Sequence, residues 1–230
     1  AIEVGAEAGS WPPEVAAREA LAALGMAKTV TLKFATEQTD RYGRLLAHVF
    51  VHDGEARRWV QAAMIAAGHA RLYALKDQRA CLADLAAEEV AARTQSLGLW
   101  AHAAYAVRDA RRVRDLNRLA GSFQIVEGTI VSAGEGREAA YLNFGRNRGS
   151  DFTVEIKPAD RVQLGALGGD VAALAGRRVR VRGWIELRGG PMIDATSSGH
   201  IEVIDSAGTS ASTVSSAVRA ESPRRSRKRA

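Results

Sequence analysis

The chain has 230 residues, of which 47% are hydrophobic, enough for one or two domains with a buried core. No apolar run approaches the ~20 residues that a membrane-spanning helix needs, so no membrane span is predicted. Cys81 is the only cysteine, which excludes an internal disulfide and a cysteine-ligated zinc cluster.

The formal net charge of +6 suggests an acidic partner, but most of this charge lies at the end of the sequence. From Ser206 onward there are six basic residues and one acid, so this tail holds +5 and the rest of the chain +1. The tail is predicted to be disordered, because its Ser, Thr, Ala and Arg composition cannot build a core. It is expected to act as a flexible tether for polyanions, or simply as a solubilising segment.

The first elements in chain order are a helix and a hairpin. Residues 11–26 predict a helix, with two prolines at its start and Gly25 at its end. Residues 28–34 alternate apolar and polar side chains, and residues 43–51 form a second strand-like run. The polar residues 35–42 between them predict a turn.

The sequence pattern from residue 53 to residue 100 is mainly helical. Asp53-Gly54 predicts a turn, residues 55–68 an amphipathic helix, and residues 69–75 a short extended piece. Residues 81–100 predict a long alanine-rich helix, within which Cys81 is expected to be a small buried side chain.

Residues 101–120 predict a helical connector rich in Arg and Asp, after which the pattern changes to strands. One helix-compatible stretch, residues 158–175, lies between the third and fourth strand-like runs. This order is typical of an OB-type barrel. The predicted organisation is therefore residues 1–100, a connector at 101–120, an OB-like domain at 121–205 and a tail at 206–230. The five strand-like runs are residues 123–133, 139–145, 151–157, 177–187 and 191–205.

The run "RRVRVRGW" in the second half places Arg178, Arg180 and Arg182 on one face of a strand. Together with Trp184 and Phe144 as stacking surfaces, these arginines are candidates for binding single-stranded nucleic acid. The alternative is a solvated outer face above a core, and the near-neutral charge of the folded part favours that alternative at least as much.

The most distinctive chemistry lies in "TDRYGRLLAHVFV", residues 39–51. Arg41, Tyr42 and Arg44 at the mouth of a strand have the donors to bind a phosphate, because the arginine fork can donate two parallel hydrogen bonds. Gly43 allows the backbone to bend or a ligand to approach closely. Taken alone, these residues favour a polar turn whose charges are solvated and paired with Asp40, since charged turns are common.

The block "DRYGRLLAHVF", its spacing to "AAGHARLY" and the terminal "GLW" resemble the staphylococcal nuclease (thermonuclease) family over about residues 1–100. The resemblance implies an OB-type barrel with helices and calcium-dependent attack of water on phosphorus. It places Arg44 at the position that stabilises the phosphodiester transition state, and Arg41 and Tyr42 where the family contacts a substrate phosphate. Residues 121–205 are similar to a C-terminal extension of some bacterial members.

The resemblance also implies differences from the family. The family has three strands before its first helix, so the sequence is expected to lack an N-terminal part, and the first barrel to be incomplete. The opening "AIEVGAE" places Glu3 at a calcium-binding aspartate and Ala6 at the catalytic glutamate. Glu7 follows one residue later and would take that role with a one-residue insertion. The alternative for Glu3 and Glu7 is a pair of ordinary exposed carboxylates.

The resulting prediction is an α+β, mainly β protein with two OB-type units that acts as a metal-dependent nuclease. It would hydrolyse DNA or RNA with little sequence preference, using Arg44 and Glu7 for catalysis, Arg41 and Tyr42 for phosphate binding, and Ca²⁺ held in part by Glu3. The alternative is a non-catalytic nucleic-acid-binding or scaffold protein with a degenerate nuclease domain. No signal peptide is visible in the sequence as it stands, and although the family is often exported, the compartment stays open.

Overall fold

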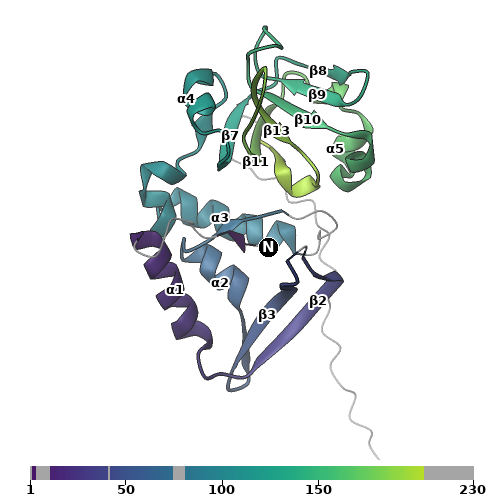
Figure 1. The fold of residues 1–230 in the computed structure, drawn as a ribbon. Helices are drawn as coiled ribbons and strands as arrows, with labels where there is room; N and C mark the ends of the chain where they lie inside the picture. Colours follow the sequence, from purple (N-terminus) through teal and green to yellow (C-terminus); the bar gives the residue numbers. More distant parts are fainter. Residues whose placement is uncertain (1, 4–10, 41, 75–80, 205–230) are drawn as a thin grey trace, which may run out of the picture.

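The structure is a computed structural model that describes residues 2–3, 11–40, 42–74 and 81–204 (Figure 1). It is a mixed α+β architecture with two main hydrophobic cores. The buried residues of one core fall within the sequence range Ala17 to Leu85, and those of the other within Ala110 to Ile201. Helix α3 lies where the two halves meet, below the strands of the second half in Figure 1.

The first half packs two helices and α3 against a three-stranded antiparallel sheet of order β2-β3-β4. Pro12 and Pro13 begin α1, where the absent N–H groups cost no hydrogen bond. A second, two-stranded pairing joins β1 to β5, with Glu3 opposite Arg71. The elements are β1 (Ile2–Glu3), α1 (Pro12–Gly25), β2 (Val30–Thr39), β3 (Leu45–Asp53), β4 (Ala56–Trp59), α2 (Val60–Ala66), β5 (Arg71–Leu72) and α3 (Leu82–Thr94).

The segment 55–68, predicted as one helix, is instead a strand followed by a shorter helix. Gly54 at φ 61° turns the chain so that β4 returns along β3, with Asp53 opposite Ala56. Trp59 then stacks on Phe50 at a centroid distance of 6.1 Å. The cross-strand packing overrides the local helical pattern, because strand formation depends on partners that the pattern does not include.

The polar residues 35–39, predicted as part of a turn, continue β2 instead. The pairing of β2 with β3 changes register between Phe34 and Thr39, as at a β-bulge. The turn is therefore shorter than predicted and lies between Thr39 and Leu45, which are paired. Cys81 also differs from expectation, because it precedes α3 and is exposed.

The second half is a barrel whose strand order can be followed from the pairings. The sheet β12-β13-β10-β9-β8 is joined to the sheet β14-β11-β7-β6, because β7 leads into β8 and β11 into β12. With β11 paired to β7 and β10 parallel to β13, the order closes as in an OB-type barrel. The strands are β6 (Arg108–Asp109), β7 (Phe123–Thr129), β8 (Ser132–Glu135), β9 (Ala140–Asn143), β10 (Thr153–Ile156), β11 (Arg178–Trp184), β12 (Glu186–Arg188), β13 (Gly190–Asp194) and β14 (Ile201–Val203).

Short helices cover parts of this barrel, including the predicted helical stretch between its third and fourth strands. They are η3 (Pro158–Leu164), α5 (Ala166–Gly169), η4 (Ala172–Leu174) and η5 (Ser198–His200). The expected connector at 101–120 differs from the structure, because most of it belongs to the second half. Strand β6 pairs parallel with β7, and Leu116 of α4 (Val113–Arg118) is fully buried in the second core. The linking helices that precede it are η1 (Gly98–Ala101) and η2 (Ala103–Tyr105).

A buried polar cluster joins the two halves. Glu89 of α3 has no solvent exposure, and its carboxylate lies 2.7 Å from the guanidinium of Arg182 on β11. The same carboxylate accepts a hydrogen bond of 2.7 Å from the backbone N–H of Leu72. Arg71 lies between the rings of Tyr105 and Phe123, at 4.9 and 5.1 Å from their centroids. These contacts fix the orientation of the second barrel relative to the first half.

Candidate functional site: the hairpin turn at residues 40–44

The turn between β2 and β3 is built around the carboxylate of Asp40. The backbone closes through hydrogen bonds from Asp40 N–H to the carbonyl of Arg44 (2.9 Å) and from Gly43 N–H to the carbonyl of Asp40 (3.0 Å). The Asp40 carboxylate also accepts hydrogen bonds of 2.9 Å from the N–H groups of Tyr42 and Arg44. Gly43 adopts φ 75°, a left-handed conformation that favours glycine.

The side chain of Arg44 is fixed at its base and exposed at its end. Its Nε donates to Asp40 Oδ2 at 2.6 Å, and its guanidinium lies 5.2 Å from the centroid of the Tyr42 ring. Even so, 75% of the Arg44 side chain is exposed. Burial alone would raise the pKa of Asp40, but the hydrogen bonds from Arg44 and Tyr42 outweigh it and lower that pKa below its ordinary value. Asp40 is therefore ionised at neutral pH and holds Arg44 in place.

This arrangement suits an oxyanion of a phosphate. Nε of Arg44 is engaged, and its two terminal amino groups have no partner among the described residues. A guanidinium presents these groups as a planar fork that matches two phosphoryl oxygens. A cation positioned before the ligand arrives stabilises developing negative charge without reorganisation.

The structure brings together two of the predicted site residues, Tyr42 and Arg44. Tyr42 is 67% exposed and lies beside Arg44 on the same turn. Glu3 lies in β1, but its side chain is not among those described; Arg41 and Glu7 lie outside the described residues. Their predicted roles stay predictions of the family resemblance.

The residue that sequence reasoning undervalues is Asp40. The sequence alone makes it the ion-pair partner in a solvated turn, whereas it accepts the hydrogen bonds that shape the whole turn. A signal for this role exists in the sequence, because Asp in a turn commonly accepts a hydrogen bond from the backbone two residues on, and a nearby Gly supplies the positive φ that such turns need.

The described residues at this turn do not form a calcium site. Ca²⁺ takes six to eight oxygen ligands, whereas the carboxylate of Asp40 is already engaged by Arg44 and Tyr42. Within the described ranges, no three His, Cys, Asp or Glu side chains cluster closely enough to hold a metal ion. Ca²⁺ with Glu3 as a ligand therefore stays a prediction of the family resemblance.

The candidate nucleic-acid face of β11 differs from the turn, because each of its arginines has a carboxylate partner. Arg178 pairs with Glu127, Arg180 with Glu127 and Glu202, and Arg182 with Glu89. Phe144 is 5% exposed and cannot act as a stacking platform, whereas Trp184 is half exposed and packs against Phe123. The prediction that these arginines form a binding groove with Phe144 is therefore wrong.

Fold and turn together define the first half as an α+β unit of the OB-barrel type that presents a fixed arginine at a hairpin. The family model described as staphylococcal nuclease homologue matches residues 14–102, so this part of the chain is similar to that family, as its motifs predicted. The match ends before the second barrel. No curated protein matches the chain. Among the described residues, no helix is both long and apolar enough to cross a membrane.

Proposed function

We propose that the protein is a nuclease that binds nucleic acid through its phosphates and hydrolyses phosphodiester bonds with little sequence preference. The observation that carries the proposal is the exposed Arg44, held by Asp40 within a domain that matches the staphylococcal nuclease family. Low sequence preference follows from this chemistry, because contacts to phosphate carry no base information.

In the proposed reaction, Arg44 donates its two terminal amino groups to the phosphoryl oxygens as negative charge develops on them. Tyr42 and Arg41 are proposed to hold a substrate phosphate beside this fork. Glu7 is proposed as the carboxylate that helps to activate the attacking water, and a bound Ca²⁺ would supply electrostatic stabilisation of the phosphoryl group. These last roles rest on the family resemblance alone.

The test is release of acid-soluble nucleotides from denatured DNA and from RNA, measured in calcium and then in EDTA. Arg44→Ala should lower activity by about 100-fold or more, the loss typical for removing a preorganised oxyanion donor. Arg44→Lys should be intermediate, because it keeps the charge but not the planar fork. Arg57→Ala, an exposed arginine on β4, is the matched control and should leave activity unchanged.

The proposal fails if the folded chain releases nucleotides equally with and without Arg44, or releases none from either substrate. The second result, with nucleic-acid binding retained, would support the non-catalytic alternative. Activity that persists in EDTA and still requires Arg44 would keep the nuclease and remove calcium from the proposal.

A further inference from the structure

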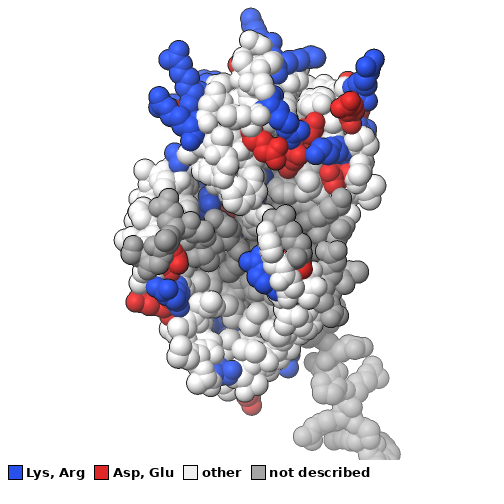
Figure 2. Space-filling model, in the orientation of Figure 1, with Lys and Arg blue, Asp and Glu red and all other residues white. Residues whose placement is uncertain are grey.

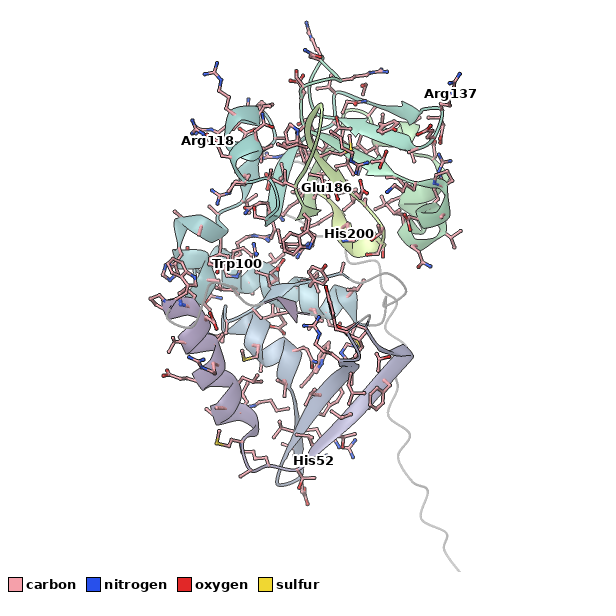
Figure 3. The ribbon with its side chains drawn as sticks, viewed as in Figure 1. His52, Trp100, Arg118, Arg137, Glu186 and His200 are labelled. Carbon is pink, nitrogen blue, oxygen red and sulfur yellow. The ribbon has the colours of Figure 1, made fainter. Side chains whose placement is uncertain are left out.

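The second barrel carries an arginine-rich surface that lies outside the family match. Residues 108–118 contain five arginines and two aspartates. Four of these arginines, Arg111, Arg112, Arg114 and Arg118, are exposed and are called here the α4 arginine surface. Leu116 anchors α4 in the barrel core with no exposed surface, so the helix is held firmly while the arginines project outward. Figure 2 shows Lys and Arg side chains gathered over α4, and Figure 3 shows Arg118 pointing away from the barrel.

The local carboxylates neutralise only part of this surface. Asp109 pairs with Arg111 at 2.8 Å, whereas Asp115 lies 3.7 Å from both Arg112 and Arg118. Exposed pairs of this kind are weak, so an anionic ligand can replace them. Arg114 has no ion-pair partner within the described ranges. The surface thus differs from β11, where Glu127 and Glu202 pair with the strand arginines.

A cavity of about 670 Å³ adjoins the surface through Arg111. Its lining includes Arg108 and two arginine–carboxylate pairs, Arg111 with Asp109 and Arg178 with Glu127, and the exposed apolar side chain of Val131. This volume lies within the range of small-ligand sites, roughly 300–1,000 Å³. The exposed side chain of Val131 beside arginine suits apolar contact with an unpaired base whose flanking phosphates contact the α4 arginines. A duplex, whose bases are stacked inside, would not use such a cavity.

From this juxtaposition we propose that the α4 arginine surface and the adjoining cavity bind single-stranded nucleic acid. The inference rests on the proposed function for the identity of the ligand, and adds to it a second contact that the family-like domain does not provide. The buried pair of Glu89 and Arg182 keeps this contact in a fixed orientation to the turn at 40–44.

The experiment measures fluorescence anisotropy of a labelled single-stranded 20-mer DNA with the full chain in EDTA, which prevents calcium-dependent cleavage. The triple variant Arg112→Ala, Arg114→Ala and Arg118→Ala should bind at least about tenfold more weakly at low salt. The slope of log K against log salt should also fall by up to about 2, since each phosphate contact to a single strand contributes roughly 0.7.

The matched control is Arg57→Ala, Arg58→Ala and Arg137→Ala, which removes the same charge from exposed positions elsewhere. Arg137 lies on the opposite side of the second barrel from Arg118 (Figure 3). Affinity should change less than twofold in this control, and the basic tail, present in both triples, should contribute equally. Thermal unfolding of both triples should match that of the parent chain.

Equal weakening in the two triples would overturn the inference, because binding would then follow net charge alone. So would tighter binding of the same sequence as a duplex, or displacement by polyglutamate at equal charge concentration, which would indicate an acidic protein partner. The variant Arg44→Ala separates the two proposals. If Arg44→Ala loses nuclease activity while the α4 triple variant binds DNA normally, the nuclease proposal stands and this surface is ruled out. If Arg44→Ala keeps its activity while the α4 triple variant binds more weakly, only the surface proposal stands.

Discussion

Two groups of arginines in this protein have sequence patterns that suit a phosphate, but they lie in opposite environments in the structure. Arg44 follows a polar turn and Arg178 to Arg182 alternate along a strand, so both sequence patterns suit a phosphate. In the structure Arg44 has one partner four residues away and remains 75% exposed. The arginines of β11 meet carboxylates from distant segments, and Arg182 is 5% exposed. Arginine therefore indicates a phosphate site only where the fold supplies too few carboxylates to pair with it.

The largest expected effect is a loss of stability when the buried arginine of β11 is removed. Arg182→Ala leaves the Glu89 carboxylate buried without its closest guanidinium, which typically destabilises a protein by about 3–5 kcal/mol. Urea unfolding at pH 7 measures this loss. The double variant Arg182→Met with Glu89→Leu should recover much of it, because an apolar pair of similar size leaves no buried charge. Stability unchanged by Arg182→Ala would contradict the role given to this pair.

The next effect in size is a pH dependence of the unfolding free energy, which arises from a buried histidine of the second barrel. Burial, followed by the nearby charge of Arg182, lowers the pKa of His200 to about 4, while Asp160 acts in the opposite direction. Its ring Nδ1 accepts hydrogen bonds from the N–H groups of Thr196 and Ser197. In the unfolded chain this histidine titrates near pKa 6.5, so the unfolded state binds the proton first as pH falls.

The free energy of unfolding should therefore decrease as the pH falls from about 6.5 to 4. His200 alone should lower it by roughly 2 kcal/mol between pH 7 and pH 5. His200→Asn keeps an acceptor for the two N–H groups but cannot titrate. Its unfolding free energy should be correspondingly less sensitive to pH over this interval. Identical pH profiles for parent and variant would show that His200 is not held neutral by the fold.

At the turn, we expect substitution of Asp40 to affect activity rather than folding. Asp40→Ala removes the group that positions Arg44, so nuclease activity should fall by about tenfold, less than for Arg44→Ala. Asp40→Asn keeps an acceptor for the backbone N–H groups and should lose less. The measurement is kcat for nucleotide release. A loss equal to that of Arg44→Ala would mean that Asp40 takes part directly and does not merely position Arg44.

The smallest effect is expected for an exposed pair on the second barrel. Asp109 accepts hydrogen bonds from the side chain and backbone of Arg111, which hold its pKa at about 2. The Arg111 side chain is nevertheless 84% exposed, so Arg111→Ala should change the unfolding free energy by less than about 1 kcal/mol. Thermal or urea unfolding measures it. A loss as large as that of Arg182→Ala would remove the distinction between exposed and buried arginines.

The first and second halves also differ in how their sheets end. The strands of the second half close into a barrel, whereas in the described part of the first half β2 has a neighbouring strand on one side only. Val30, Leu32 and Phe34 on β2 are each between 40% and 43% exposed. Each of them lies opposite an apolar residue of β3. The alternation that predicted a half-buried strand therefore places the apolar side chains on one face of β2, although that face is only partly buried.

The sequence by itself determined what depends on neighbours in the chain. Prolines and alanines specify α1, alternation specifies β2 and β11, and Asp40, Gly43 and Arg44 specify the turn through contacts within five residues. The family resemblance over the first half also followed from local motifs and their spacing.

Only the tertiary structure decided the features that join distant segments. The β4 strand depends on packing against β3, and Arg182 meets a carboxylate that lies on a helix of the other half. Whether an arginine binds a ligand or stabilises the fold depends on which carboxylates the fold brings within a few ångströms of it. A linear sequence does not contain those distances, because residues far apart in the chain become neighbours only when the core forms.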